Sequence, residues 1–406
     1  MSNIEWTDTT WSPVVGCTPV SPGCLNCYAA TMARRLEAMG RTEYAPREVE
    51  CYACGGEGTY PDVGRCPWCS KGQETVRIAE VRGGRAVFTG DVRTVPDRLT
   101  DPLHWRKPRM VFVNSMSDLF HEDVPFEFID RVFAVMALCP QHTFQVLTKR
   151  PERMAEYCNR RYMPGAICDA AIAMRRSIVK TEIKEHDDGA YSKLTGPAWP
   201  LPNVWLGASV EDQARADERI PNLLRCPAAV RFLSCEPLLG ELDIGRWLCD
   251  NVYLNWVIVG GESGPNARPC DVAWIRSIVR QCREAGVTCF VKQLGAWPEC
   301  DESGSVQVLR CRACGTVQGN MECDVLGGDE AVYRVTRKGK KRKVVMVREE
   351  ELFCWKCGAS SQRDGPQRLH DRKGGDPSEW PEDLRVREWP KGSDESRVTS
   401  DEKGGA

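Results

Sequence analysis

The sequence predicts an α/β protein built on a β/α barrel or partial barrel, and three observations support this fold class. Short apolar runs alternate with amphipathic stretches of helical length, polar residues follow each apolar run, and two cysteine-rich segments interrupt the alternation. The chain has 406 residues, of which 42% are hydrophobic and 28% are charged, and its formal net charge is -2. This composition excludes a wholly disordered chain and an overall polycation or polyanion. Any nucleic-acid contact must therefore come from a local patch.

Six apolar runs predict the strands of the sheet. Each run is short, nearly continuous and rich in β-branched or aromatic residues, as strands buried on both faces of a parallel sheet are. They cover residues 109–113, 143–147, 203–207, 230–233, 256–260 and 288–291. Amphipathic stretches at 126–138, 212–224 and 272–285 predict helices between them, the last ended by Gly286 as a C-cap glycine. These connections suit right-handed β-α-β crossovers.

Polar and ionisable side chains follow all six runs, at the strand ends where β/α barrels and open α/β sheets place their active sites. A polar loop after one strand needs no functional explanation, but six in succession favour a shared polar mouth. The candidates to bind a cofactor or substrate there are Asn114, Ser115, Ser117, Ser209, Glu211, Ser263 and Gln293, and the candidates for catalysis are Asp118, Lys149, Glu236, Glu262 and Lys292.

The cysteine-rich segments predict a divided chain. We expect residues 1–39, 86–299 and 365–390 to form a discontinuous barrel, with zinc modules inserted at 40–85 and 300–364. Residues 391–406 contain almost no apolar side chain and predict a disordered tail. The amino-terminal segment has no apolar core, and no run of 18 or more apolar residues occurs, so neither secretion nor membrane spanning is expected.

The 22 cysteines are therefore expected in the reducing cytoplasm, where CxxC pairs more often bind metal or act as redox centres than form disulfides. The first group is Cys17, Cys24 and Cys27, in VVGCTPVSPGCLNCYAA. A closed zinc site needs four ligands, whereas a [4Fe-4S] cluster held by three cysteines keeps one iron open. Iron-sulfur binding is favoured; zinc with a remote fourth ligand and reduced structural thiols are the alternatives. The loop precedes a helix that begins near Tyr28, which would place it at the polar mouth.

Two further groups predict one zinc ion each. The first of these groups has two CxxC knuckles, which match a tetrahedral zinc site. The second group also has two CxxC pairs, and it resembles a zinc ribbon whose strands at 331–337 and 342–348 flank a basic turn. The basic tip at 337–343 either contacts nucleic-acid phosphate or is only a solvated tip. The predicted ligands are Cys51, Cys54, Cys66 and Cys69 in the first module and Cys311, Cys314, Cys354 and Cys357 in the second, with Cys323 a spare thiol or an alternative ligand.

Two single residues have competing interpretations. Cys235 follows a predicted strand and precedes Glu236, so it is either a catalytic thiol or, as is usual for cysteines in apolar segments, a small buried hydrophobe. His121 lies at the polar mouth and either transfers a proton or binds a ligand, or it only caps and hydrogen-bonds the loop.

Eight segments of the chain resemble a known family. They are IEWTDTTWSPVVGCTPVSPGCLNCYA, VFVNSMSDLFHEDVP, VLTKRPERM, WLGASVEDQ, FLSCEPLLG, VIVGGESGPNARP, VKQLG and DRKGGDPSEWPEDLRVREWP. They resemble the successive blocks of the phage gene-product-37/gene-product-68, or three-Cys-motif, family and span nearly the whole chain outside the two zinc segments. That family has no assigned function. Its three-cysteine loop and barrel-like alternation are similar to radical S-adenosylmethionine enzymes of the spore photoproduct lyase type, although the first two cysteines are further apart here.

The resemblance implies that Cys17, Cys24 and Cys27 hold a [4Fe-4S] cluster whose open iron binds the amine and carboxylate of S-adenosylmethionine, the source of a 5'-deoxyadenosyl radical. It adds Asp371, Arg372 and Lys373 to the mouth. It also implies a protein partner and, for a phage-encoded chain, the cytoplasm of the bacterial host. The expected function is thus an iron-sulfur, radical-SAM-like enzyme that modifies or repairs a nucleic acid or nucleotide.

Two alternative functions stay open. The chain is then either a non-catalytic, zinc-stabilised protein that binds nucleic acid or a partner, or a metal-dependent nuclease. A fourth ligand beside the three cysteines favours the first alternative. The second needs at least two carboxylates close enough to share a divalent ion, chosen from Asp118, Glu211, Glu236 and Glu262.

Overall fold

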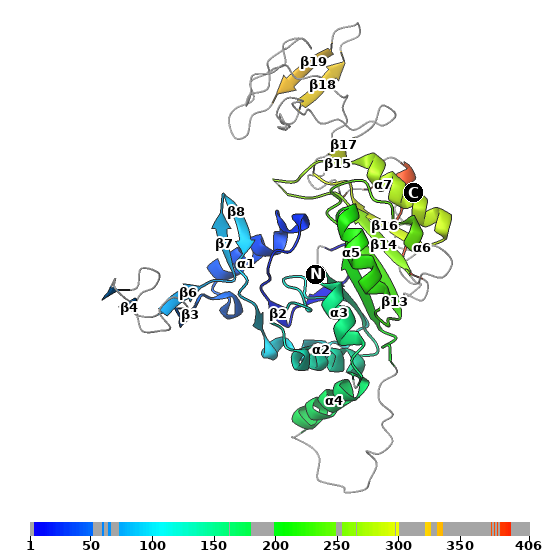
Figure 1. Cartoon of the computed structure of the whole chain (residues 1–406). Coiled ribbons are helices and arrows are strands. Elements are labelled where there is room, and N and C mark those ends of the chain that lie inside the picture. Colours follow the sequence, from blue (N-terminus) through cyan, green and yellow to red (C-terminus); the bar gives the residue numbers. More distant parts are fainter. Residues whose placement is uncertain are drawn as a thin grey trace. The chain divides into compact units, whose positions relative to one another are not determined.

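A seven-stranded sheet organises the chain in its computed structural model (Figure 1). The structure describes residues 4–51, 59–60, 64–65, 73–161, 163–179, 199–248, 254–264, 266–296, 298–299, 321–325, 331–335, 375, 377, 380 and 382–390. The strands of the sheet follow chain order: β1 (Thr9–Trp11), β10 (Met110–Val113), β11 (Thr143–Thr148), β12 (Val204–Ser209), β13 (Val230–Cys235), β14 (Trp256–Gly260) and β16 (Thr288–Gln293).

The sheet is a parallel half-barrel, which confirms the predicted α/β class and is compatible with a partial barrel. Thr9 pairs with Val111 and Phe144 pairs with Val204, and this in-order parallel pairing is the pattern of β-α-β units. β10, β12 and β14 are buried along their whole length, since both faces of the sheet are covered. All six predicted runs are strands, with bounds that differ by at most two residues.

The helices lie between the strands. They are α1 (Tyr28–Ala38), α2 (Phe126–Leu138), α3 (Pro151–Cys158), α4 (Met163–Val179), α5 (Gln213–Leu224), α6 (Gly245–Leu248) and α7 (Val272–Ala285), with 3-10 turns at Pro22–Cys24, Thr42–Tyr44, Pro96–Arg98, Asp101–His104 and Glu382–Leu384. α2 and α7 have the predicted bounds, and α5 begins one residue later because Asp212 is its N-cap and accepts a hydrogen bond from the Arg215 amide. α4 was not predicted.

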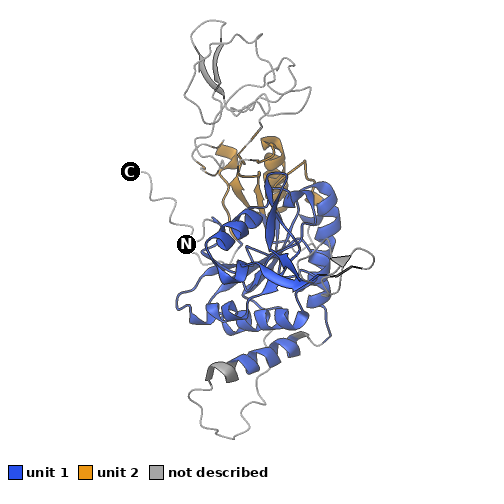
Figure 2. Cartoon of the chain, turned by 90° about the vertical axis from the view of Figure 1, so that its left-hand side faces the viewer, with its two compact units in different colours: residues 1–234, 246–257, 390–406 blue, residues 235–245, 258–389 orange. Residues whose placement is uncertain are grey.

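The chain divides into two compact units, which are described separately (Figure 2). The first unit comprises 1–234, 246–257 and 390–406, and the second comprises 235–245 and 258–389. An aromatic core fills the first unit: the rings of Trp6 and Phe112 lie 4.8 Å apart, and Trp256 lies 5.8 Å from Phe232. A Cβ at Gly207 would come within 2.5 Å of the Phe232 ring, so the core requires glycine there.

In the second unit, α7 packs against β16, and its apolar face buries Ile275, Ile278 and Cys282. A carboxyl-terminal segment, 386–388, runs along β16 and is called the strap. The Val291 amide donates to the Val386 carbonyl at 2.8 Å, and the Glu388 amide donates to the Cys289 carbonyl at 2.9 Å. The strap therefore extends the hydrogen bonding of the last strand of the sheet.

Small sheets complete the secondary structure. Antiparallel pairs form between β2 (Val14–Val15) and β9 (Arg93–Thr94), β3 (Arg47–Glu50) and β6 (Gln73–Val76), β4 (Thr59–Tyr60) and β5 (Gly64–Arg65), β7 (Ala79–Arg82) and β8 (Arg85–Phe88), and β18 (Met321–Val325) and β19 (Ala331–Val335), and a parallel pair forms between β15 (Cys270–Asp271) and β17 (Pro298–Glu299). None of the helices in the described part of the chain is long and apolar enough to span a membrane.

The two predicted zinc modules are described only in part. β3 and β6 flank the CxxC segment of the first, and its Cys51 is buried. The β7–β8 hairpin packs against α1, so the boundary that we placed at residue 85 falls inside this hairpin. In the second module β19 lies where a strand was predicted, and it pairs with β18. The remaining predicted zinc ligands, strand 342–348, the basic tip 337–343, the residues Asp371, Arg372 and Lys373, and the tail 391–406 lie outside the described residues.

Candidate functional site

The three-cysteine loop, defined as residues 16–27, follows β1 and the short strand β2 and leads into α1. Gly16 begins the loop with a φ of 87° and forms a parallel bridge with Ser117, which follows β10. A Cβ at Gly16 would lie 2.0 Å from the Asp91 carbonyl oxygen, so only glycine fits. The loop therefore lies at the carboxyl end of β10, as the sequence predicted.

A guanidinium lies beside one sulfur atom of this loop, and backbone amides lie beside another. Cys17 Sγ lies 3.7 Å from a guanidinium nitrogen of Arg150. Burial, reinforced by the charge of Asp118, raises the pKa of Cys17 to about 12. Burial also raises the pKa of Cys27, against the hydrogen bonds that its sulfur accepts from the amides of Ala30 and Ala29 at the start of α1. As free thiols these cysteines are protonated at neutral pH and are poor nucleophiles.

Arg150 connects the loop to the residues that follow β10 and β11. Its guanidinium donates to Asp118 Oδ2 at 3.3 Å, to Glu122 Oε2 at 2.8 Å and to the Thr18 carbonyl at 3.2 Å. Asp118 also accepts hydrogen bonds from the Thr148 hydroxyl at 2.7 Å and from the Lys149 amide at 3.0 Å. The side chain of Asp118, a predicted catalytic candidate, is thus occupied in holding the ends of two strands together.

Glu211, which follows β12, fastens the middle of the three-cysteine loop. It is fully buried, and its Oε2 lies 2.9 Å from Arg219 and 3.8 Å from Lys149 Nζ. Its Oε1 accepts hydrogen bonds from the Ser21 hydroxyl and from the Gly23 amide. Burial acts to raise the pKa of Glu211, but the charges of Lys149 and Arg219 and these hydrogen bonds outweigh burial and lower it.

Asn114 closes β10 in a left-handed conformation, with a φ of 59°. Its Oδ1 accepts a hydrogen bond from the Val14 amide at 3.3 Å, while its Nδ2 is buried and has no hydrogen-bond partner among the residues that the structure describes. Two of its neighbours bond the elements on either side of the loop: the Ser117 hydroxyl donates to the Val14 carbonyl in β2, and the Ser115 carbonyl accepts from the Tyr28 hydroxyl in α1 at 2.8 Å. The structure therefore places Asn114, Ser115 and Ser117 beside the two ends of the loop, and their role in cofactor binding stays a prediction.

His121 supports the same loop. Its Nδ1 accepts a hydrogen bond from the Asp123 amide at 3.1 Å, so the proton of the neutral ring is on Nε2, which lies 2.8 Å from the Thr18 hydroxyl. Burial, aided by the charge of Arg150, lowers the pKa of His121. This geometry fits the loop-bonding interpretation. Cys235 is fully buried at the end of β13, which fits the interpretation as a small hydrophobe.

The predicted mouth residues of the second unit form a separate set of contacts. Lys292 Nζ lies 3.0 Å from Glu236 Oε1, and Arg268 donates to both carboxylate oxygens of Glu262, at 2.7 and 2.9 Å. The Gln293 side chain donates to the Gly261 carbonyl at 2.7 Å. Only glycine fits at residue 261, because a Cβ there would lie 2.4 Å from the Leu294 carbonyl oxygen. Ser263 is half-buried in this segment, and Ser209 is buried in the first unit, where its carbonyl accepts from Arg219.

Each of the four acidic candidates therefore has a cationic side chain as its partner: Asp118 with Arg150, Glu211 with Arg219, Glu236 with Lys292, and Glu262 with Arg268. Within the described ranges, no three Cys, His, Asp or Glu side chains lie close enough to hold one metal ion. The three cysteines of a cubane cluster bind different irons and need not converge in that way.

Sequence reasoning missed several residues that shape the site. Arg150 is adjacent to the candidate Lys149, and its position after a strand was the available signal. Arg219 lies on α5, two helical turns after Glu211, and a charged residue on a helix gives no sign in sequence that it is buried. Gly23 was also missed, although a Cβ there would lie 2.7 Å from Glu211 Oε1.

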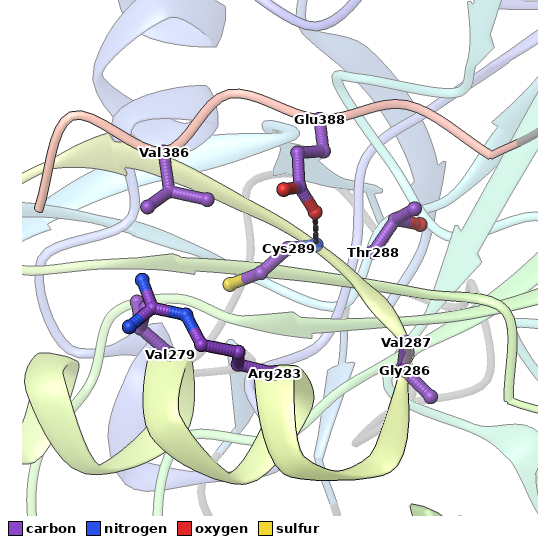
Figure 3. Close-up of a pocket in the computed structure, with 8 residues that line it drawn as sticks. All are labelled: Val279, Arg283, Gly286, Val287, Thr288, Cys289, Val386 and Glu388. Carbon is purple, nitrogen blue, oxygen red and sulfur yellow. Dashed lines mark hydrogen bonds between the residues drawn. The ribbon is translucent and has the colours of Figure 1, made fainter.

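A small cavity lies elsewhere, at the amino end of β16 in the second unit (Figure 3). Its volume is about 230 Å³, and it lies between the end of α7 and the strap, with Arg283, Cys289 and Glu388 among its lining residues. In the close-up, the Glu388 carboxylate accepts the hydrogen bond of the Cys289 amide, at 3.2 Å. None of the predicted site residues lines this cavity.

The fold and the loop define an α/β protein whose parallel half-barrel carries three cysteines at the carboxyl ends of its strands. A model of the family described as a protein of unknown function (DUF5131) matches residues 1–348, and the chain belongs to this family. No curated protein and no solved structure matches it.

Proposed function

We propose that the chain is an iron-sulfur enzyme of the radical S-adenosylmethionine kind that modifies or repairs a nucleic acid or nucleotide. The observation that carries this proposal is the three-cysteine loop, which lies at the carboxyl ends of parallel strands with a guanidinium beside the sulfur of Cys17 and backbone amides beside that of Cys27. The substrate class comes from the resemblance of the sequence blocks, and what supports the cluster site is the position of Arg150 beside Cys17 and of the first amides of α1 beside Cys27.

The donor set fits a [4Fe-4S] cluster held by Cys17, Cys24 and Cys27. Thiolate ligands carry negative charge, and Arg150 and the first amides of α1 offset it. When bound, such a cluster supplies the electron for reductive cleavage of S-adenosylmethionine. Because burial raises the pKa of Cys17 and Cys27, binding of a cluster would release the protons that these two thiols hold at neutral pH.

The residues around the loop have positioning roles in this proposal. Glu211 holds residues 21 and 23 in place, Arg150 holds residues 17 and 18, and His121 holds the Thr18 hydroxyl. Asn114 Nδ2 is a buried donor that no group in the described structure satisfies, and it is available to a carboxylate or carbonyl oxygen of a bound cofactor. Lys149, whose side chain is 20% exposed, is the cation of this set that an anionic substrate can reach most directly.

The test is anaerobic purification followed by iron and acid-labile sulfide assays and electron paramagnetic resonance. We expect iron and sulfide in the wild-type protein, a spectrum that shifts when S-adenosylmethionine is added, and 5'-deoxyadenosine after reduction with dithionite. Changing Cys17, Cys24 or Cys27 to Ser removes most of the iron while the zinc content stays unchanged, since the proposed zinc ions are bound by the two CxxC modules.

The matched control is Cys168→Ser, which changes a half-buried cysteine on α4, outside the loop. We expect this variant to retain its iron. A wild-type protein that contains zinc and no iron after anaerobic preparation would contradict the proposal and favour the non-catalytic alternative.

A further inference from the structure

The exposed apolar side chains of the described residues gather around the three-cysteine loop. Six large hydrophobic side chains are markedly exposed in this part of the chain, and five of them lie on the loop or at α1 and its C-cap. They are Val20, Leu25, Tyr28, Met32 and Met39, of which Tyr28 is 57% exposed and Met39 is 76% exposed. Exposed apolar side chains that cluster in this way mark a binding surface more often than scattered ones do.

Four of the exposed residues share one face of α1. Tyr28, Met32, Arg35 and Met39 follow one another at intervals of four, three and four residues, which places them in a row along the helix. We call this row the α1 stripe. The opposite face of α1 is formed by Ala29, Ala30 and Ala33, which are buried against the β7–β8 hairpin. The stripe therefore contributes little to the core.

The aromatic ring of the stripe is held in a fixed orientation. The Tyr28 hydroxyl donates to the Ser115 carbonyl at 2.8 Å, so the ring lies beside the end of β10, while more than half of the residue stays exposed. A ring fixed in this way loses little side-chain entropy when a flat partner stacks on it. Base stacking on such rings is a common, sequence-tolerant mode of binding to single strands.

The stripe also carries a positive charge that the described residues do not neutralise. Arg35 is exposed and makes no ion pair or side-chain hydrogen bond within this part of the chain. Glu37, two residues further along, is paired with both Arg34 and Arg77. The stripe thus combines a flat aromatic ring, thioether side chains and a free guanidinium. A strand of alternating bases and phosphates is complementary to this combination.

We propose that the α1 stripe binds a single-stranded segment of nucleic acid and leads its target base to the three-cysteine loop, an inference that rests on the proposed function. A base stacks on Tyr28, and a phosphate of the same strand pairs with Arg35. The stripe spans about 16 Å, at 1.5 Å per helical residue, so it accommodates several nucleotides of an extended strand and is longer than a free nucleoside needs.

The test is fluorescence anisotropy of a labelled oligothymidine single strand titrated with the full-length protein. Tyr28→Ala is expected to weaken binding by about 5- to 150-fold, the range for loss of one base stack. Arg35→Ala is expected to weaken binding and to lower the slope of log affinity against log salt by about 0.7, as for one lost phosphate contact on a single strand. Tyr28→Phe keeps the ring but removes the hydrogen bond to the Ser115 carbonyl, so we expect a smaller loss of affinity than in Tyr28→Ala.

The matched controls are Val81→Ala and Arg85→Ala, which change an exposed apolar residue and an exposed arginine of the β7–β8 hairpin that has no ion-pair partner in the described ranges. We expect both controls to bind like the wild type. The proposal is overturned if the wild type binds no strand, if the stripe variants bind as well as the controls, or if free adenosine displaces the probe as effectively as unlabelled strand does. The proposal is also overturned if the stripe variants change only self-association or the binding of another protein and leave strand binding unchanged.

Iron content measured on the same samples separates this inference from the proposed function. Iron present without strand binding overturns the α1 stripe proposal alone. Strand binding that depends on Tyr28 and Arg35 in a protein without iron overturns the iron-sulfur proposal and leaves a nucleic-acid-binding protein. Circular dichroism of each variant checks that the exposed substitutions leave the fold unchanged.

Discussion

Glu211 has no exposed surface, and its carboxylate has two cations, Arg219 and Lys149, for partners. Arg219 is itself only 2% exposed, so neither charge of this pair can be solvated if the other is removed. Buried ion pairs add little stability compared with apolar packing, but removing one partner leaves an uncompensated buried charge. The pair is therefore sensitive to single substitutions.

We expect Glu211→Gln to lower the free energy of unfolding by about 3–5 kcal/mol, because it leaves Arg219 buried without its counter-charge. Urea denaturation followed by tryptophan fluorescence measures this change. Since Glu211 also fastens the loop at Ser21 and Gly23, the same variant should retain less iron after anaerobic preparation.

Glu218→Gln is the matched control for this prediction. Glu218 lies on α5 next to Arg219, and its carboxylate pairs with Arg215 while 64% of its side chain is exposed. A surface pair of this kind contributes about 0–1 kcal/mol. If the two variants unfold at the same urea concentration, the buried pair does not have the role described here.

Sequence reasoning found the residues of the site that follow strands, because a strand end is visible in the pattern. Asn114, Asp118, Lys149 and Glu211 were predicted in this way, and the structure places all four around the loop. It did not find Arg219, since the burial of a helical arginine depends on which face of α5 meets the sheet. It also could not predict that the acidic candidates are individually neutralised.

At the scale of elements, some bounds depend on neighbouring residues and others on pairing with a distant strand. The N-cap of α7 is Asp271, whose side chain accepts from the Ala273 amide, and its C-cap is Gly286, in a left-handed conformation with a φ of 67°. Both signals are local, so the bounds of α7 could be predicted. β1 has three residues, two of them threonines, and is a strand only because it pairs with β10. Such a strand has no signal of its own.

Gly286→Ala is expected to destabilise the second unit by about 1 kcal/mol. A Cβ at this position meets no atom within 4 Å, so the cost comes only from the positive φ, which alanine adopts unfavourably. Gly240→Ala is the control, because Gly240 also has open space around it and does not have a positive φ. Equal unfolding free energies for the two variants, measured in urea, would argue against the C-cap role of Gly286.

At the scale of the whole molecule, the fold could be predicted further than the function. The order and parallel direction of six of the seven strands follow from the β/α alternation, which each segment reveals locally, whereas β1 is added only by its pairing with β10. The sheet is a half-barrel, and the β/α alternation of the sequence does not distinguish a half-barrel from a closed barrel. The metal chemistry is still a prediction, since sulfur spacing indicates which residues can serve as ligands and does not identify the ion.

Acid is expected to destabilise the folded chain because His142 is buried in it. Burial lowers the pKa of His142 below its ordinary value of 6.5, so the unfolded chain takes up a proton that the native ring does not. Stability should therefore fall as the pH drops below about 6.5, by up to about 1.4 kcal/mol per pH unit for this group, until the lower native pKa is reached.

Unfolding free energies at pH 7.5 and 5.5 measure this effect. In His142→Gln the difference between the two pH values should shrink, whatever the stability of the variant at pH 7.5. His121, whose pKa is lowered in the same direction, accounts for part of the difference that remains. An unchanged difference in the variant would show that other groups cause the acid sensitivity.

The strap has a consequence for how the protein is made. β16 ends at Gln293, yet the segment that satisfies its outer amides and carbonyls is at 386–388. A ribosome adds about 5–20 residues per second, so a newly formed β16 waits for several seconds or longer before its covering segment emerges. During that interval the strand presents an unpaired edge, the kind of template on which nascent chains associate.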